Sequence, residues 1–406
     1  MALSSCTSSR STWLSPWGYA GFLVLFCAQE ARADQHLFKN SPSPWLRDVT
    51  LSGLLEGGIT ANPARPHDGV NFGNFISDRA NQAQINQLEL TLEKANDPTI
   101  PRYQIGFILE GMYGSDPRYF HLLGVSNKLT KDRYQLVPAQ AHVNFHLPIL
   151  TKKGLDLQAG ILQTPMGVEP LDPSERPFYT LTYISQYSAP VEHLGAMAYW
   201  HLTHRVDLNF GIDSGNQTTF GHRENHGSAA GYVGFTLNNL AHGKLTIVEL
   251  SRIGPENTVS PEGTPHKAQR YWNDIAAYLS VTKRLSLTGE FNFLRDNGMR
   301  TNAWGLATFL SYKLSPTVTF NYRGELYRDS SGNLVGSTTP QGTALPTTFG
   351  ALSLGFAYKP DLGHGIRVFE IHPEIRFDRS LNGRRIFNDR RNIGMFTFGG
   401  DMMIGF

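Results

Sequence analysis

The connections between the predicted strands of this chain alternate in length between short and long. Segments of alternating apolar and polar residues recur from residue 49 to residue 406, and they predict sixteen strands with no helical period. Short connections are predicted near residues 97, 152, 204, 241, 283, 315 and 362. Long ones are predicted at about 61–83, 115–133, 167–192, 215–228, 254–269, 295–301, 329–347 and 379–392. Barrels that cross the outer membrane have short periplasmic turns and long extracellular loops, whereas a soluble sandwich has no reason to follow this rule. The sequence therefore predicts an all-β, transmembrane, antiparallel up-and-down β-barrel.

The distribution of apolar residues supports the same conclusion. Beyond the N-terminal region no run reaches the ~18 apolar residues that a transmembrane helix needs. Backbone N–H and C=O groups in hydrocarbon need internal partners, so a closed barrel is the other structure that can span a bilayer. The mean hydropathy of −0.28 is typical of soluble proteins. A barrel gives such a value because only every second strand residue meets lipid.

The N-terminus has the pattern of a secretory signal peptide. Arg10 supplies a basic region, residues 19–28 an apolar core and residues 31–33 a small-x-small cleavage site. We predict a signal peptide at 1–33, a periplasmic lead-in at 34–48 and an outer-membrane barrel at 49–406. An uncleaved N-terminal anchor is the alternative, but the apolar core is short for a membrane span. The predicted location is the bacterial outer membrane.

Cysteine content and charge narrow the range of partners. Both cysteines, Cys6 and Cys27, lie in the predicted signal peptide, so the exported chain is expected to form no disulfide. The formal net charge of the whole chain is +2, and nothing in this balance suggests nucleic acid as a partner.

The sequence offers little support for catalysis or for a metal site. It has no G-x-S-x-G, no Gly-rich phosphate loop and no H-E-x-x-H motif. His142 and His146 face the same side of a predicted strand, but four strand residues separate them by roughly 13 Å. They are therefore predicted to line the lumen rather than to chelate one ion. We expect no cofactor, no metal and no enzymatic activity, because a barrel hydrolase would need a converging serine, histidine and orienting partner.

The segment from residue 155 to 202 contains the longest predicted loop between two strands. Residues 164–169 break the alternation, and the loop at 167–192 is predicted to fold into the lumen; the alternative is an exposed cap. Charged side chains of the loop and of the opposite inner wall are predicted to line a constriction and to set ionic selectivity. These residues are Glu169, Asp172, Glu175, Arg323, Glu374 and Arg376. The alternative is that these are solvated groups of the barrel interior that pair with neighbours, as Glu374 and Arg376 could do on one face of their strand.

The last predicted strand ends on an aromatic residue. Phe396, Phe398, Met402, Ile404 and Phe406 share one face of it. An alternating strand that ends on phenylalanine resembles the signal that the barrel assembly machinery reads. Phe406 is therefore predicted to act as the assembly signal.

Two patches of the chain resemble a known family. Residues 159–160, 164–169 and 177–179, and the strand at 373–378, are similar to the putative beta-barrel porin-2 (OmpL-like) family. That family often has a basic or aromatic residue where Ile161 stands, and an aromatic where Val168 stands. The resemblance implies an outer-membrane barrel that works as a passive channel.

The function that we predict is an outer-membrane porin, a passive diffusion channel for small hydrophilic solutes. The main alternative is a non-channel barrel with a plugged lumen, acting in adhesion or as a scaffold, and a barrel hydrolase is a more distant one. The expected partners are outer-membrane lipid, small hydrophilic solutes and the barrel assembly machinery. A homotrimer is an assembly that the sequence leaves open.

Overall fold

The computed structural model describes residues 35–97, 100–126, 132–219, 228–256, 268–363, 366 and 368–406. The predicted signal peptide at 1–33 lies outside the described residues.

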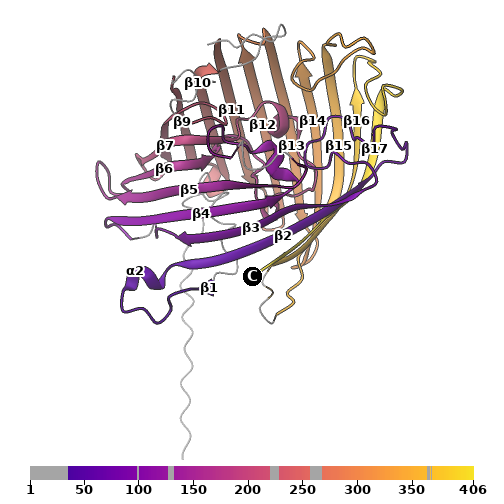
Figure 1. Cartoon of the computed structure of the whole chain (residues 1–406). Helices are drawn as coiled ribbons and strands as arrows, with labels where there is room; N and C mark the ends of the chain where they lie inside the picture. Colours follow the sequence, from indigo (N-terminus) through magenta and orange to yellow (C-terminus); the bar gives the residue numbers. More distant parts are fainter. Residues whose placement is uncertain are drawn as a thin grey trace, which may run out of the picture.

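Sixteen antiparallel strands form a closed barrel (Figure 1), which confirms the predicted fold class. Each strand pairs with its neighbours in sequence, and β17 pairs with β2 to close the sheet. The strands are β2 (Thr50–Ala61), β3 (Ala83–Lys94), β4 (Gln104–Gly114), β5 (Gln135–Leu147), β6 (Leu155–Gln163), β7 (Glu192–His201), β8 (Val206–Asp213), β9 (Ala230–Asn239), β10 (Leu245–Glu256), β11 (Ala268–Ser280), β12 (Leu285–Asp296), β13 (Thr301–Lys313), β14 (Val318–Asp329), β15 (Thr347–Tyr358), β16 (Val368–Ser380) and β17 (Gly394–Gly405).

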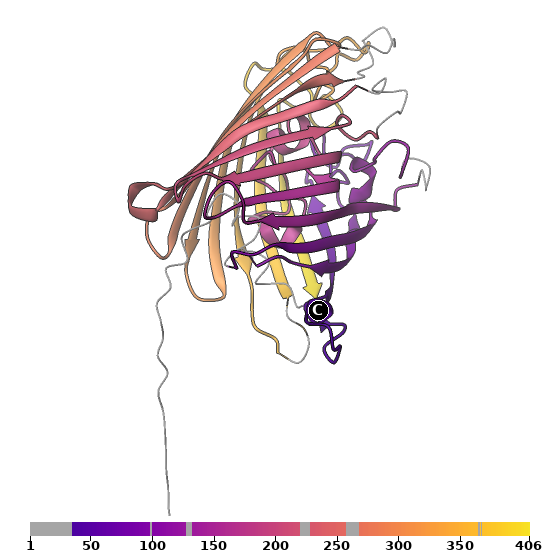
Figure 2. The same cartoon turned by 90° about the vertical axis from the view of Figure 1, so that its left-hand side faces the viewer.

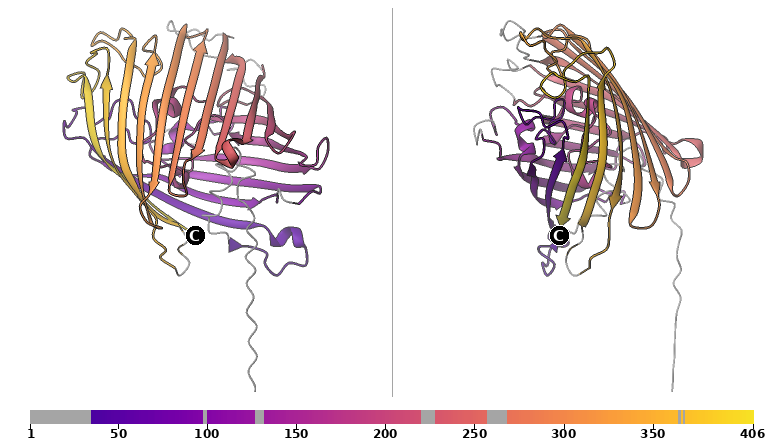
Figure 3. Two further views of the ribbon diagram at one scale, coloured as in Figure 1. Left: turned by 180° about the vertical axis from the view of Figure 1, so that it is seen from behind. Right: turned by 90° about the vertical axis from the view of Figure 1, so that its right-hand side faces the viewer.

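The lead-in before β2 and the end of β17 lie at the end of the barrel where most of the short turns are found. The short strand β1 (Gln35–His36) pairs with β2, and the helix α2 (Pro44–Arg47) follows it. The Trp45 indole N–H donates to the Ile105 carbonyl at 2.9 Å, which fixes the lead-in to β4. Figure 2 and Figure 3 show α2 and the C-terminus at the same end of the barrel.

The strands alternate between an apolar outer face and a more polar inner face. In β13, Trp304 and Leu306 point outward and are exposed, whereas Ala303 and Ala307 point inward and are buried. Side chains on successive residues of a strand point to opposite faces, so this period of two gives one surface for lipid and one for the lumen.

The connections follow the predicted alternation with one exception. Long connections include 62–82, 164–191 and 330–346, and short ones include 202–205 and 281–284. The connection from β12 to β13 was predicted to be long, at 295–301, and this prediction is wrong. Here β12 runs to Asp296 and β13 begins at Thr301, and the backbone N–H of Met299 donates to Asp296 Oδ1 at 2.8 Å to close a tight turn.

Short helices occur only in connections among the described residues. They are η2 (Asp116–Tyr119), η3 (Pro173–Glu175), α3 (Tyr183–Tyr187) and α4 (Leu240–Gly243), with α2 in the lead-in. None of the helices described is long and apolar enough to cross a bilayer.

Candidate functional site

The connection between β6 and β7, residues 164–191, folds back against the inner wall of the barrel. We call it the internal loop. Its two ends are held together by the Thr164 N–H, which donates to the Val191 carbonyl at 2.8 Å. Proline cannot donate to a strand ladder, and prolines at 165, 170, 173, 177 and 190 keep the segment out of the sheet. Two side-chain caps shape it: Asp172 accepts from the Ser174 N–H at the start of η3, and Thr182 from the Ser185 N–H at the start of α3.

Arg323 on β14 holds the internal loop at two points. Its Nη1 donates to Glu169 Oε1 and to the Thr180 carbonyl, both at 2.6 Å, and its Nη2 donates to Thr180 Oγ1 at 2.7 Å. The guanidinium also lies over the Phe178 ring at 4.8 Å. Arg323 has no exposed surface. Because its fixed fork of donors reaches both Glu169 and Thr180, this one residue joins the two halves of the loop to the wall.

Arg376 on β16 forms a second attachment around α3. Its Nη1 donates to Glu325 Oε1 at 2.8 Å, and its Nε and Nη2 donate to the Asp378 carboxylate at 2.9 Å. The two carboxylates in turn hold the loop. The backbone N–H of Tyr183 donates to Glu325 Oε2 at 2.9 Å, and the Tyr183 hydroxyl donates to Asp378 Oδ1 at 3.0 Å. The arginine therefore orients two acceptors that bind the start of α3.

A third attachment joins the loop to β2 and β3. Arg176 Nη2 lies 3.4 Å from Glu56 Oε1, and the Tyr179 hydroxyl donates to Asn86 Oδ1 at 3.0 Å. Burial opposes the charge on Arg176, but the carboxylates of Glu56 and Asp116 outweigh this effect and raise the pKa of the guanidinium. Arg176 thus remains a cation within the loop.

Small residues on the inner wall make room for the loop. A Cβ atom on Gly58 of β2 would lie 2.5 Å from the Tyr179 ring, and one on Gly305 of β13 would lie 2.3 Å from Ile184. Contacts this close do not occur between carbon atoms, so these positions require glycine while the loop is docked. The wall and the loop are complementary in shape as well as in charge.

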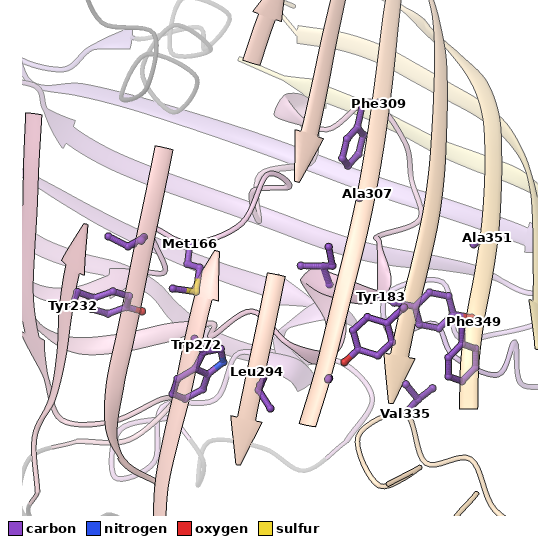
Figure 4. Packing of buried hydrophobic residues seen from close by; sticks show 14 of the residues in the cluster. Met166, Tyr183, Tyr232, Trp272, Leu294, Ala307, Phe309, Val335, Phe349 and Ala351 are labelled. Atoms are coloured by element: carbon purple, nitrogen blue, oxygen red, sulfur yellow. The ribbon is translucent and has the colours of Figure 1, made fainter. Parts of the chain in front are cut away.

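Buried aromatic rings add apolar packing to these contacts. Phe178, Tyr179 and Tyr183 are each 1% exposed or less. The Tyr183 ring stacks on Phe349 with centroids 4.7 Å apart, and Figure 4 shows the two rings side by side. A fully buried ring of this size contributes about 1.5–3 kcal/mol. The docked position is therefore a stable part of the fold.

A cavity of about 240 Å³ lies beside the internal loop, and its lining includes Arg176 but no residue of β14 or β16. The loop forms one side of it, and residues of β5, β6, β7, β10 and β11 form much of the rest. Acidic residues predominate among the charged residues of this lining, which are Glu93, Glu169, Asp172, Glu175, Arg176 and Asp274.

The predicted site residues divide into two groups in the structure. Glu169, Asp172 and Glu175 border the cavity, although the Glu169 carboxylate turns to Arg323. The other three, Arg323, Glu374 and Arg376, lie on the inner wall but beneath the loop. Glu374 Oε2 accepts from the Thr180 N–H at 3.3 Å. The expectation that the two arginines line an open constriction is therefore corrected, because aromatic and backbone groups of the loop cover both guanidiniums.

Sequence reasoning missed Arg176 and the two wall glycines. Nothing in the sequence near Arg176 indicates its distant partner Glu56. The run of small inward residues on β13, Ala303, Gly305 and Ala307, is a signal that could have located the docked helix.

Phe406 and the two strand histidines have defined surroundings. The Phe406 N–H donates to the Gly53 carbonyl at 3.1 Å, and its ring packs over Gly53 on the outer face. Its role in assembly stays a prediction. His142 borders the cavity, whereas His146 contacts the Asp156 carboxylate at 2.6 Å. Within the described residues, no three His, Cys, Asp or Glu side chains are arranged to hold a metal ion.

A closed sixteen-strand barrel with an apolar exterior, a charged interior and an internal loop beside a cavity is the architecture of an outer-membrane porin. The chain belongs to the family described as putative beta-barrel porin-2, OmpL-like, whose sequence profile matches residues 48–406. This confirms the family resemblance and the location in the bacterial outer membrane. No curated protein sequence matches the chain.

Solved porin structures share the fold at low sequence identity. OmpF of Salmonella typhi in complex with daunomycin is 8% identical, with a TM-score of 0.58 over 88% of this chain and 97% of that one. The anion-selective porin from Comamonas acidovorans is 11% identical, with a TM-score of 0.56 over 88% of this chain and 99% of that one. The outer membrane channel DcaP of Acinetobacter baumannii is 10% identical, with a TM-score of 0.55 over 88% and 97%. At these identities the likeness concerns the fold alone.

Proposed function

We propose that the chain is a passive diffusion channel in which small hydrophilic solutes pass beside the docked internal loop. The observation that carries the proposal is the position of the cavity between the loop and the wall of β5–β7, β10 and β11. A loop held by Arg323 and Arg376 against the other wall narrows the lumen without filling it. This arrangement favours a channel over a scaffold with a plugged lumen.

The charges at the cavity support a preference for cations. Asp172, Glu175 and Asp274 border it, while the one arginine there, Arg176, lies beside Glu56. In a narrow aqueous path few waters screen the field of such side chains, so acidic groups attract cations and repel anions. The similar structure described as anion-selective has the same fold, so the preference proposed here rests on the side chains at the cavity and not on the fold.

The test is the electrical behaviour of the purified protein in a planar bilayer. We expect steady conductance steps and, in a salt gradient, a reversal potential that corresponds to a cation/anion permeability ratio above one. An absence of conductance from protein that is folded would favour the plugged scaffold. A ratio below one would refute the charge argument and leave the channel standing.

The side of the membrane that the loops face is part of the same proposal. Long connections such as 330–346 are proposed to lie outside the cell, and short ones such as 148–154 to lie in the periplasm. An epitope tag in 330–346 is expected to be reachable on intact cells, and a tag in 148–154 is not. The reverse labelling would overturn this orientation.

We also propose that the protein works as a homotrimer and without catalysis. The trimer is supported by the similar structure of the outer membrane protein OmpT of Vibrio cholerae in a trimer form, with a TM-score of 0.51. Against a hydrolase, the serine and histidine at the cavity have other partners: Ser185 donates to Glu169, and His142 contacts Asn144. Light scattering of the detergent-solubilised protein tests the trimer, and a monomeric mass would refute it.

A further inference from the structure

Three hydrogen-bonded polar side chains stand on the outer face of the barrel. Asn273 Nδ2 donates to Ser251 Oγ at 2.6 Å, and Ser251 Oγ donates to Glu249 Oε1 at 2.6 Å. Glu249 is paired across the sheet with Ile275, which is 42% exposed, whereas its neighbour Asp274 faces the cavity. Paired residues of a sheet point to the same face, so all three side chains point away from the lumen. We call Glu249, Ser251 and Asn273 the polar island.

Apolar side chains surround the polar island on every side. Along β10, Ile247 precedes it and Ile253 follows it on the same face. The outward residues Val233 of β9 and Phe291 of β12 are 58% and 44% exposed, and Ile253 is 49% exposed. The outward apolar band of such barrels is about 25 Å tall. Glu249 therefore lies within the band that meets hydrocarbon, and not at its polar margin.

Glu249 lies deeper in the apolar band than the other outward-facing charged side chains of the described strands. It alone has apolar outward residues on both sides along its own strand. The outward basic residues stand at strand ends, where water and lipid headgroups are within reach; they are Lys94, Arg295, Arg328 and Arg379. A carboxylate that faces lipid is costly, and ionisable residues at this depth are usually paired with another polar group.

We propose that copies of this chain associate in the membrane through the outer face of β9–β11, with the polar island at the centre of the contact. The island carries an acceptor, the Glu249 carboxylate, and a donor, the Asn273 amide. One copy can therefore supply the hydrogen bonds that the next copy lacks. No described strand offers an outward basic residue at the same depth, so we place this same face of every copy around the common axis of the assembly. The inference rests on the proposed homotrimer and names the surface that forms it.

Disulfide trapping tests the contact in intact membranes. The only cysteines of the chain are Cys6 and Cys27, both in the predicted signal peptide, so an introduced cysteine has no competitor after export. Ile275→Cys places a thiol beside the polar island, and Ile375→Cys is a matched control on β16, 45% exposed and also outward. We expect disulfide-linked pairs of the barrel with Ile275→Cys under mild oxidation, and none with Ile375→Cys. Equal yields for both variants, or no linked species in either, would overturn the proposal.

A second variant tests the polar contribution itself. Glu249→Leu matches the surrounding apolar surface, so the barrel is expected to remain heat-modifiable while association weakens roughly five- to thirtyfold. Glu249→Gln, which keeps hydrogen-bonding groups, is expected to associate nearly as well as the natural chain. Unchanged association of Glu249→Leu would show that lipid or another protein covers this face, and would overturn the proposal. Normal single-channel conductance in that experiment would leave the channel function intact.

Discussion

Replacing Arg323 by methionine should release the internal loop from the wall. The natural side chain donates to Glu169, to the Thr180 carbonyl and to the Thr180 hydroxyl, at 2.6, 2.6 and 2.7 Å. Methionine fills similar volume but leaves the Glu169 carboxylate without its cation. Removing one partner of a buried ion pair costs about 3–5 kcal/mol. The population of the detached loop should therefore rise roughly a hundred- to several-thousandfold.

The sheet itself should survive this change, because its backbone ladders do not involve the Arg323 side chain. A detached loop moves into the space of the cavity, so single-channel recordings should show frequent partial closures and a lower mean conductance. Arg328→Met is the matched control, since Arg328 is on the same strand but faces outward and binds Thr348. If recordings of the Arg323 variant match those of the control and the natural protein, Arg323 does not hold the internal loop against the wall.

Three further predictions follow from features of the barrel. Gly305→Leu should push Ile184 and its helix off the wall and reduce conductance, because even a Cβ atom would lie 2.3 Å from that side chain; normal currents would contradict the docking argument. The double variant Asp172→Asn and Glu175→Gln should lower the cation/anion permeability ratio in reversal-potential measurements, and an unchanged ratio would remove these residues from the selective path. Deleting Phe406 should leave protease-sensitive protein in the periplasm, and a normal yield of heat-modifiable barrel would count against the assembly signal.

The strand pattern could be predicted because it is a local property of the chain. Ala303 and Ala307 point inward and Trp304 and Leu306 outward in β13, and the period of two in the sequence shows this directly. The prediction failed between β12 and β13 for a related reason. The inner face of a barrel is polar, so the inward Asp296 at the end of β12 has the same polarity as a loop residue.

The arrangement of the site could be predicted only in part. The alternation of side chains along a strand predicts that Arg323 and Arg376 face the lumen, and the acidic half of the loop is expected to face them. Which side of the lumen stays open depends on how Tyr179 fits against Gly58, residues that are far apart in sequence. A local sequence pattern does not indicate which residues far apart in the chain will pack together. The covered arginines therefore emerged only from the structure.

The internal loop also has a consequence for the order of folding. Its ties join residues far apart in the chain: Glu169 and Arg323 are 154 residues apart, and Tyr183 and Asp378 are 195 apart. Contacts of such long sequence separation form late, because the loop-closure entropy must be paid before the contact exists. The loop should therefore dock only after β14 and β16 have joined the sheet. A barrel arrested before that step would contain an undocked loop. The width of the pore therefore depends on β14 and β16, which lie in the last third of the sequence.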